Sequence, residues 1–453
     1  MLTVTLSVRS LLFALGLVGL GLLATVEARA TNYNVDTTAD IIPFPPDPRI
    51  SLRSALNSAN SNPGPDKIIL PAGIYTLNIT GSGDDTNSAG DLDIRDSVTI
   101  TGAGPDKTII DGKDLNDRIF HLPYDGYSPR INVLISNLTI QNGKLTATDA
   151  NMGGGGIYNR QTLTLNNVVV KNNSVAGAGG GGIQSDHELT LNKVVVQGNR
   201  VDEVGDVTYR TGGGIYNSAL YSGSMVMTDS IVAGNRARVG AGIYTYDALI
   251  ERSLLTGNWA GIYGGAILSV GALQLVNATI HANTSDYGAA LRVSAGEAQI
   301  SFCTITGNQS FGSHPAVFVD PSASLALHNS ILANNYTGTN EILNCSLSYP
   351  PTSATYNLED ANTCEFSKAT NMINTDPKLG PLQDNGGPTQ TRALAADSPA
   401  IDYVRIDTGV TVDQRGFTPP VGPWADIGAY EYEPPPLCFP VKSPDGKTAV
   451  ICL

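Results

Sequence analysis

An asparagine recurs through the middle of the chain at a nearly constant spacing, and each copy closes a short alternating stretch such as 230–235, SIVAGN. The seven copies are Asn173, Asn199, Asn235, Asn258, Asn283, Asn308 and Asn335. They are separated by 23 to 27 residues, with one interval of 36. A unit this short cannot bury its own apolar face, so neighbouring units must stack on one another to form a continuous core.

A second motif, a glycine-rich turn that enters a strand, alternates with the first. Its clearest copies are Gly155-Gly156-Ile157-Tyr158-Asn159, Gly181-Gly182-Ile183-Gln184-Ser185 and Gly213-Gly214-Ile215-Tyr216-Asn217. The rhythm within the units has period two, as in Leu163-Thr164-Leu165, which is typical of strands. Repeats of about 25 residues with short strands and no helical period predict an all-β fold, a right-handed parallel β-helix.

The recurring asparagine has a physical reason in such a solenoid. Asparagine tolerates the left-handed backbone conformation of a sharp turn, and its amide can bond to nearby backbone. Stacked coils place equivalent residues about 4.8 Å apart, so the amides can pair from coil to coil. We therefore predict that the seven asparagines form a structural ladder.

The first thirty residues are typical of a secretory signal. An apolar run from Leu11 to Ala24 follows Arg9, and the small-residue site Ala28-Arg29-Ala30 comes after it. A retained anchor helix is the alternative, but the apolar run is short for a membrane span. We expect a mature chain that is secreted or held at the cell surface, is monomeric and has no membrane span.

Export permits disulfides. The spacings suggest one bond between Cys345 and Cys364 and another between Cys438 and Cys452. Cys303 lies in an apolar strand and is expected to be a buried free thiol. No cysteine or histidine spacing matches a zinc site.

Charge narrows the classes of partner. The net charge is −14, and Asp and Glu outnumber Lys and Arg by 41 to 27. Nucleic acid is excluded as a partner because phosphate binding needs clustered basic residues. Tight binding to an acidic polysaccharide is also disfavoured unless metal ions bridge the charges. The partner we expect is an extracellular polysaccharide or a surface protein.

Two terminal segments resemble known modules. Val35 to Asp40, Ile50 to Leu56 and Gly90 to Ile94 together resemble the N-terminal domain of bacterial surface proteins that carry a CSLREA motif, with Ile50 in place of the Cys and Ser54 in place of the Glu. The resemblance implies a capping helix over Leu52 to Ala59 and a first coil that begins between Ile68 and Ile79.

The other segment contains four motifs in order: Gly380 to Thr389, Ser398 to Asp402, Asp413 to Gly416 and Asp426 to Glu431. They resemble a choice-of-anchor domain, which follows such β-helices. The two resemblances imply a bacterial protein with a pectin-lyase-like fold. The predicted organisation is a signal peptide at 1–30, a cap with the first coils at 31–112, β-helix repeats at 113–340, the choice-of-anchor-like region at 341–432, and a Pro-rich linker with a Cys-containing tail at 433–453.

Catalysis on polysaccharides would need paired carboxylates, or acidic calcium ligands beside a base. The weak catalytic candidates are Asp202, Glu203, Asp206 and Arg210, in the longest insertion between coils, where a solvated loop is the default interpretation. Asp91 and Asp93 would share one face of a strand and are weak metal candidates, although a capping role is favoured. No cofactor is required by these patterns, and calcium is the ion that they could accommodate.

A binding surface has more support than an active site. If the isoleucines of the glycine-rich motif point inward, the next residue of each coil points outward. The outward column contains Tyr158, Tyr216, Tyr244, Arg292 and Phe318. Aromatic rings on an exposed sheet suit sugars or proteins, although tyrosine is also simply a good strand residue.

Three functions follow from these patterns. The first is an extracellular, adhesin-like or glycan-contacting β-helix without catalysis. The second is a polysaccharide lyase or glycoside hydrolase, which would need acidic residues and a base gathered in one groove. The third is a passive spacer.

Overall fold

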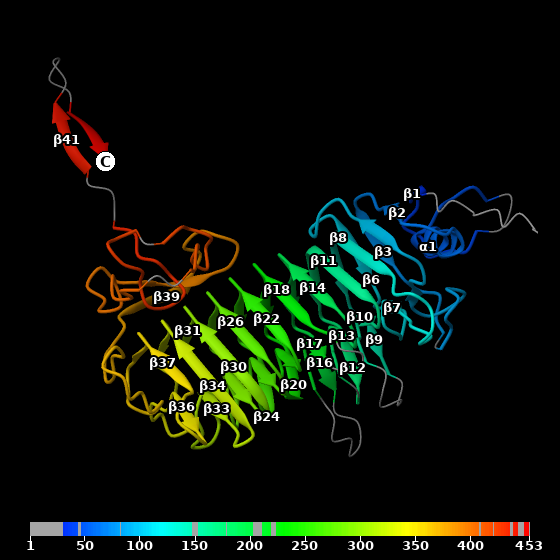
Figure 1. The fold of residues 1–453 in the computed structure, drawn as a ribbon. Coiled ribbons are helices and arrows are strands. Elements are labelled where there is room, and N and C mark those ends of the chain that lie inside the picture. Colours follow the sequence, from blue (N-terminus) through cyan, green and yellow to red (C-terminus); the bar gives the residue numbers. More distant parts are fainter. Residues whose placement is uncertain are drawn as a thin grey trace, which may run out of the picture.

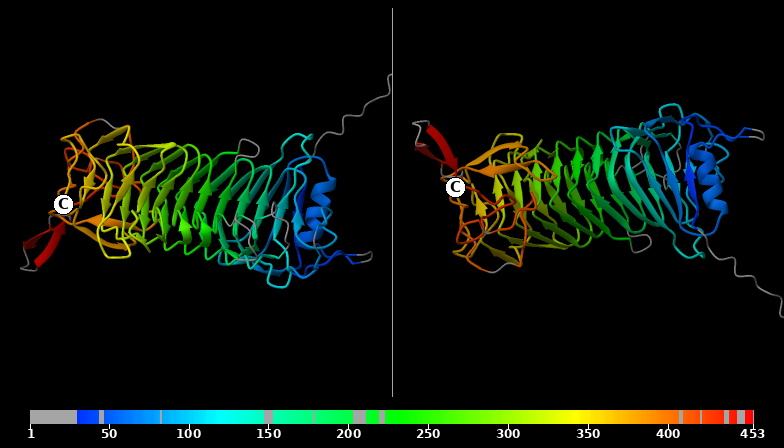
Figure 2. Two further views of the ribbon diagram at one scale, coloured as in Figure 1. Left: turned by 90° about the horizontal axis from the view of Figure 1, so that it is seen from below. Right: turned by 90° about the horizontal axis from the view of Figure 1, so that it is seen from above.

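The computed structural model describes residues 30–452 apart from 44–46, 82, 147–152, 178, 203–210, 219–222, 407–408, 420, 435–437 and 443–447. The described chain is all-β with one helix, and its strands stack as a parallel β-solenoid (Figure 1). This confirms the predicted parallel β-helix. Coils follow one another along the solenoid in sequence order, as the colours of Figure 2 show.

Sheet B contains the strands of the glycine-rich motif, one per coil, all parallel. Its strands are β4 (Leu92–Asp93), β7 (Phe120–Leu122), β10 (Ile157–Asn159), β13 (Ile183–Ser185), β17 (Ile215–Asn217), β21 (Ile243–Thr245), β25 (Ile267–Ser269), β29 (Leu291–Val293), β33 (Val317–Val319) and β36 (Cys345–Leu347).

Sheet C is a narrower parallel sheet that follows the asparagine turn. Its strands are β9 (Lys144–Leu145), β12 (Ser174–Ala176), β16 (Arg200–Asp202), β20 (Arg236–Val239), β24 (Trp259–Tyr263), β28 (Thr284–Ser285) and β32 (Gln309–Ser310).

Sheet A is the largest, because the long strands β8 and β11 join two parallel stacks into one sheet. Its strands are β1 (Asn32–Asn34), β2 (Asp66–Ile69), β3 (Gly73–Thr76), β5 (Val98–Thr101), β6 (Thr108–Asp111), β8 (Asn132–Gln141), β11 (Thr162–Lys171), β14 (Leu189–Asn192), β15 (Val195–Gln197), β18 (Met225–Thr228), β19 (Ile231–Ala233), β22 (Ala248–Glu251), β23 (Leu254–Thr256), β26 (Leu273–Val276), β27 (Thr279–His281), β30 (Gly296–Ser301), β31 (Thr304–Thr306), β34 (Ala323–His328), β35 (Ile331–Ala333), β37 (Ser353–Thr355) and β38 (Leu358–Glu359).

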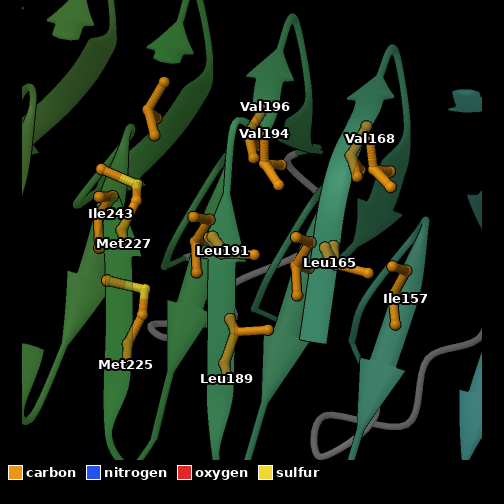
Figure 3. Packing of buried hydrophobic residues seen from close by; sticks show 14 of the residues in the cluster. Ile157, Leu165, Val168, Leu189, Leu191, Val194, Val196, Met225, Met227 and Ile243 are labelled. Atoms are coloured by element: carbon orange, nitrogen blue, oxygen red, sulfur yellow. The ribbon is translucent and has the colours of Figure 1, made fainter. Parts of the chain in front are cut away.

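The core lies between the sheets and is built from aliphatic columns. Ile157, Ile183 and Ile215 pair in register from coil to coil and are fully buried. Figure 3 shows how side chains from sheet A, such as Leu165 and Leu191, point toward the same interior. Burying each such side chain contributes about 1.5–3 kcal/mol, so stacking stabilises coils that could not fold alone.

The asparagine ladder is confirmed, but its backbone conformation differs from the prediction. Each ladder side chain is fully buried, and Asn235 Nδ2 donates to Asn258 Oδ1 at 3.0 Å. The same Oδ1 accepts the backbone N–H of Asn235. The left-handed position is one residue earlier, at Gly234 (φ 61°). The residue before each ladder asparagine makes the turn, and it is glycine in four coils and Asn172, Ala282 or Asn334 in the others. The ladder asparagine itself satisfies buried backbone.

Helix α1 (Leu52–Ser61) covers the N-terminal end of the solenoid (Figure 2). Its buried face includes Leu52, Ala55 and Leu56. Ser51 caps the helix, and Ser54 bonds back to the Ser51 N–H at 2.9 Å, which completes a capping box. This serine therefore supplies the contact for which a capping box more often uses Glu or Gln.

The C-terminal part folds back over sheet A. The hairpin of β39 (Leu379–Gln383) and β40 (Thr391–Leu394) belongs to this part. Gln414 Oε1 accepts from Thr279 on β27 at 2.6 Å, and the Ala429 N–H donates to Thr304 on β31 at 3.1 Å. A second hydrophobic core, which includes Ile331 and Ile427, lies beneath it.

The cysteine predictions have separate outcomes. Cys345 and Cys364 form a disulfide, and Cys303 is a buried free thiol. Strands β41 (Cys438–Lys442) and β42 (Thr448–Cys452) place Cys438 opposite Cys452 in an antiparallel hairpin. A bond between those two cysteines stays a prediction.

Candidate functional site

A continuous row of side chains runs along the outer face of sheet B. Each member is the second residue of its strand, and each is paired in register with the next coil. The row, from the N-terminal end, is Asp93, His121, Tyr158, Gln184, Tyr216, Tyr244, Leu268, Arg292, Phe318 and Ser346. We call it the sheet B row. It contains the outward column predicted from the sequence and extends it to Asp93 and His121.

The row is less exposed than the sequence suggested. Tyr158 is 5% exposed, and its hydroxyl donates to Asp186 Oδ2 at 2.7 Å. Placing Tyr158 on an open binding surface was therefore wrong, because it is packed and held by a carboxylate. Tyr216, Tyr244 and Phe318 are partly exposed, so the accessible part of the row begins after the buried Gln184.

Two tyrosines of the row, Tyr216 and Tyr244, lie close to a third, Tyr246, which follows β21. The ring of Tyr244 lies 5.1 Å from the ring of Tyr216 and 6.2 Å from that of Tyr246. Burial, with the nearby Tyr246, raises the pKa of Tyr216 to about 12, and burial also raises the pKa of Tyr244. All three half-buried rings expose apolar area, and the Tyr216 and Tyr244 hydroxyls stay protonated as hydrogen-bond donors at neutral pH.

A second aromatic group adjoins the row two coils further on. The Arg292 guanidinium lies 3.8 Å from the centre of the Tyr263 ring and is paired with Asp320 at 2.9 Å. Tyr287 stacks on His314 with ring centres 3.6 Å apart. Residues from sheet B, sheet C and the turn between them thus form one aromatic and cationic patch.

Charged residues cluster at the N-terminal end of the row. The cluster consists of Asp85, Asp91, Asp93, Asp117, Arg118 and His121. We call it the acidic cluster. His121 Nδ1 lies 3.0 Å from Asp93 Oδ1 and 3.5 Å from Asp85 Oδ1. Arg118 Nε lies 3.1 Å from Asp91 Oδ2, an ion pair that is too poorly aligned to be a hydrogen bond.

Burial dominates the electrostatics of this cluster. Burial, with the charges of Asp117 and Asp93, raises the pKa of Asp91 to about 8 even though Arg118 opposes the shift. Burial also raises the pKa of Asp93 and of Asp117. In contrast, the Asp85 side chain is 67% exposed. The cluster therefore has buried carboxyls with one solvent-facing carboxylate.

The N-terminal cap holds this cluster in place. Asn87, which is left-handed (φ 60°) and fully buried, accepts the Asp93 N–H and donates to the Asp93 carbonyl. Arg53 of α1 donates to the carbonyls of Gly90 and Asp91. The motifs that suggested a known N-terminal module thus brace Asp91 and the strand β4, which follows it and ends at Asp93.

Among the residues that the structure describes, no contact joins the catalytic candidates of the long insertion to the acidic cluster or to the sheet B row. Asp202, on β16, pairs with Arg200 of the same strand at 2.8 Å, with the two side chains 38% and 58% exposed. Glu203, Asp206 and Arg210 lie outside the described residues.

His121 was not predicted as a site residue because it belongs to no recognisable histidine motif. It joins the site only because its strand lies one coil beyond that of Asp93. Asp117 and Arg118, which precede the strand of His121, were not predicted either. The site therefore offers two chemistries: mixed carboxylate and imidazole donors at one end, and an aromatic platform along the middle. Within the described residues, no helix is long and apolar enough to cross a membrane.

Comparisons with known proteins found similarity to solved structures alone. No protein-family model matches the chain, and no curated protein does. Among solved structures, the chain is similar to pectate lyase Pel9A at 13% identity and a TM-score of 0.49, covering 89% of this chain and 96% of the other. It is also similar to a Geobacillus virus E2 protein, ORF18, at 12% identity and a TM-score of 0.38, covering 68% and 57%. The CSLREA and choice-of-anchor resemblances stay predictions.

Proposed function

We propose that this protein is an extracellular β-helix that binds a polysaccharide along the sheet B row, without cleaving it. The observation that carries the proposal is the pair of partly exposed tyrosines, Tyr216 and Tyr244, in register on neighbouring coils. Beyond the buried Leu268, the partly exposed Arg292 and Phe318 form a second such pair in the same row. Side chains in register on successive coils offer a surface along which a sugar polymer can lie.

The chemistry of the row suits sugars. Flat tyrosine rings bring apolar area to the carbon-bound faces of a sugar and cost little side-chain entropy. The Tyr216 hydroxyl and the Arg292 guanidinium add hydrogen-bond donors for sugar hydroxyls. The net charge of −14 favours a neutral polysaccharide over an acidic one.

A glycan array followed by titration calorimetry tests the proposal. Tyr216→Ala combined with Tyr244→Ala should weaken binding of the best glycan at least tenfold, about 1.4 kcal/mol. Tyr127→Ala is the matched control, because Tyr127 is 95% exposed and outside the row. Binding that survives the double substitution, or is lost equally in the control, would contradict the proposal.

A second function, a polysaccharide lyase or glycoside hydrolase, is favoured by the acidic cluster. His121 stacks on Tyr158 with ring centres 5.4 Å apart, so the carboxyls adjoin the row. However, Asp91, Asp93 and Asp117 are each at most 6% exposed, which leaves little room for a sugar. Release of new sugar ends from a polysaccharide panel, abolished by Asp91→Asn but not by Asp114→Asn, would establish this function instead.

Export is the remaining part of the proposal. It rests on the apolar run of Leu11 to Ala24 and the small-residue site after it. Secretion of the full chain but not of a chain that starts at Thr31 would support export. Equal retention of both inside the cell would contradict it.

A further inference from the structure

We propose that Asp85, Asp93 and His121 form a binding site for a divalent transition-metal ion of the zinc type. The three side chains come from the loop before β4, from β4 and from β7. One donor atom of each lies within 4.8 Å of the others. Two donors bound at about 2.1 Å to a tetrahedral ion lie about 3.4 Å apart, close to the 3.0 and 3.5 Å found around His121 Nδ1.

Hydrogen bonding alone leaves this arrangement incomplete. His121 Nδ1 carries at most one proton, so it can donate to only one of the two carboxylates that approach it. Asp93 is fully buried, and its Oδ2 has no hydrogen-bond partner among the described residues. A buried carboxylate oxygen without a partner is costly, and a bound cation would satisfy it.

The loop that carries Asp85 is shaped to present it. The preceding Asp84 accepts hydrogen bonds from the backbone of Thr86, Ser88 and Ala89. The hydroxyls of Thr86 and Ser88 donate to the same carboxylate. Asp84 is thus occupied in organising the loop, and Asp85 remains free to face His121.

The site is held by fixed groups around it. Asp91 and Asp117 lie beside the three ligands, and Arg118 is the cation paired with Asp91. The backbone of Asp93 is fixed by Asn87 and Asn60, so the buried ligand is held before the ion arrives.

The donor set selects the ion. Calcium and magnesium prefer oxygen ligands, whereas imidazole nitrogen with carboxylates suits zinc and related ions. Three protein ligands leave a fourth position open for water or a ligand. Of the two aspartates predicted to bind calcium, Asp93 is a ligand of this site, whereas Asp85 and His121 take the place of Asp91. The ion is of the zinc type rather than calcium.

Metal titration of the full mature chain, first stripped with a chelator, tests the site. We expect one Zn²⁺ per chain by calorimetry and a visible absorption band with Co²⁺. Asp85→Asn and His121→Gln should each weaken Zn²⁺ binding at least tenfold, as should Asp93→Asn. Asp114→Asn, an exposed carboxylate of the same region, is the control and should bind as the parent does.

Asp93 is buried, so its substitution could impair folding. Asp85 is exposed, and circular dichroism of Asp85→Asn should match the parent, which makes that variant decisive. The absence of stoichiometric Zn²⁺ binding would overturn the proposal. So would Zn²⁺ binding that is unchanged in both Asp85→Asn and His121→Gln, or Ca²⁺ binding that is tighter than Zn²⁺ binding and is lost in these variants.

Discussion

Arg53 and Asp40 form an ion pair in which neither side chain is exposed, with Nε 2.7 Å from Oδ1. The remaining donors of Arg53 reach the carbonyls of Gly90 and Asp91. Asp40 in turn accepts the N–H groups of Asn78 and Ile79. One buried pair thus ties the cap to the segment that enters β4, which contributes Asp91 and Asp93 to the acidic cluster.

Removal of Arg53 should be strongly destabilising. Arg53→Met leaves the Asp40 carboxylate buried without its partner, which costs about 3–5 kcal/mol. Urea unfolding should show this loss. Arg49→Met is the control, because Arg49 is exposed and pairs with Asp47 two residues away. Equal stability of the two variants would show that the buried pair does not hold the cap.

Interruption of the asparagine ladder should also be costly. Asn235→Ala removes the Oδ1 that accepts both the N–H and the side-chain amide of Asn199. Two buried donors lose their partner, at about 1–3 kcal/mol each. Asn192→Ala removes the exposed hydrogen bond that the Asn192 side-chain amide donates to Asn166 Oδ1. This substitution should change the free energy of unfolding by less than about 0.5 kcal/mol. Thermal unfolding of both variants measures the difference, and similar melting temperatures would argue against the ladder.

The disulfide should stabilise the C-terminal coils. It links Cys345 of β36 to Cys364 across 19 residues, and loops of this size give about 3 kcal/mol. Cys345→Ser with Cys364→Ser should lower the melting temperature.

Burial raises the pKa of the Cys303 thiol to about 12, so native protein should resist alkylation at that residue. Rapid native alkylation of Cys303 would contradict its burial.

Stability should fall as the pH rises from about 4 toward 7 because of two carboxyls in the C-terminal part, Asp426 and Glu431. Burial raises the pKa of Asp426 to about 7, and it also raises the pKa of Glu431. The folded state then holds protons that the unfolded chain releases above about pH 4, so the stabilisation is complete below that pH and is lost toward pH 7. Asp426 contributes up to about 1.4 kcal/mol per pH unit in this window.

Asp426→Asn tests this linkage by slope. The variant loses a backbone acceptor and is less stable overall, but its melting temperature should vary less between pH 5 and pH 8 than that of the parent. Identical pH slopes in the two proteins would contradict a raised pKa at Asp426.

The sequence was sufficient for the solenoid because its period is local. Each coil repeats the same turn and strand motif. Because Ile157 and Ile183 occupy the same position in that motif, their pairing can be predicted from the motif alone. The ladder was predictable for the same reason. Its backbone conformation was not, because Gly234 and Asn235 are adjacent and either could have occupied the left-handed position.

The acidic cluster was only half predictable. Asp91 and Asp93 were visible as an alternating pair, but their neighbours depend on how coils of unequal length stack. His121 reaches Asp93 because β7 pairs directly with β4, and nothing local to His121 indicates that pairing. The burial of Tyr158 depends on Asp186 in the next coil, and was missed for the same reason.

The most direct test of the central claim is a crystal structure of the protein with the best oligosaccharide from the array. We predict sugar density along sheet B, in contact with the rings of Tyr216 and Tyr244. Sugar bound at sheet A or at the C-terminal region, with the sheet B row empty, would contradict the account.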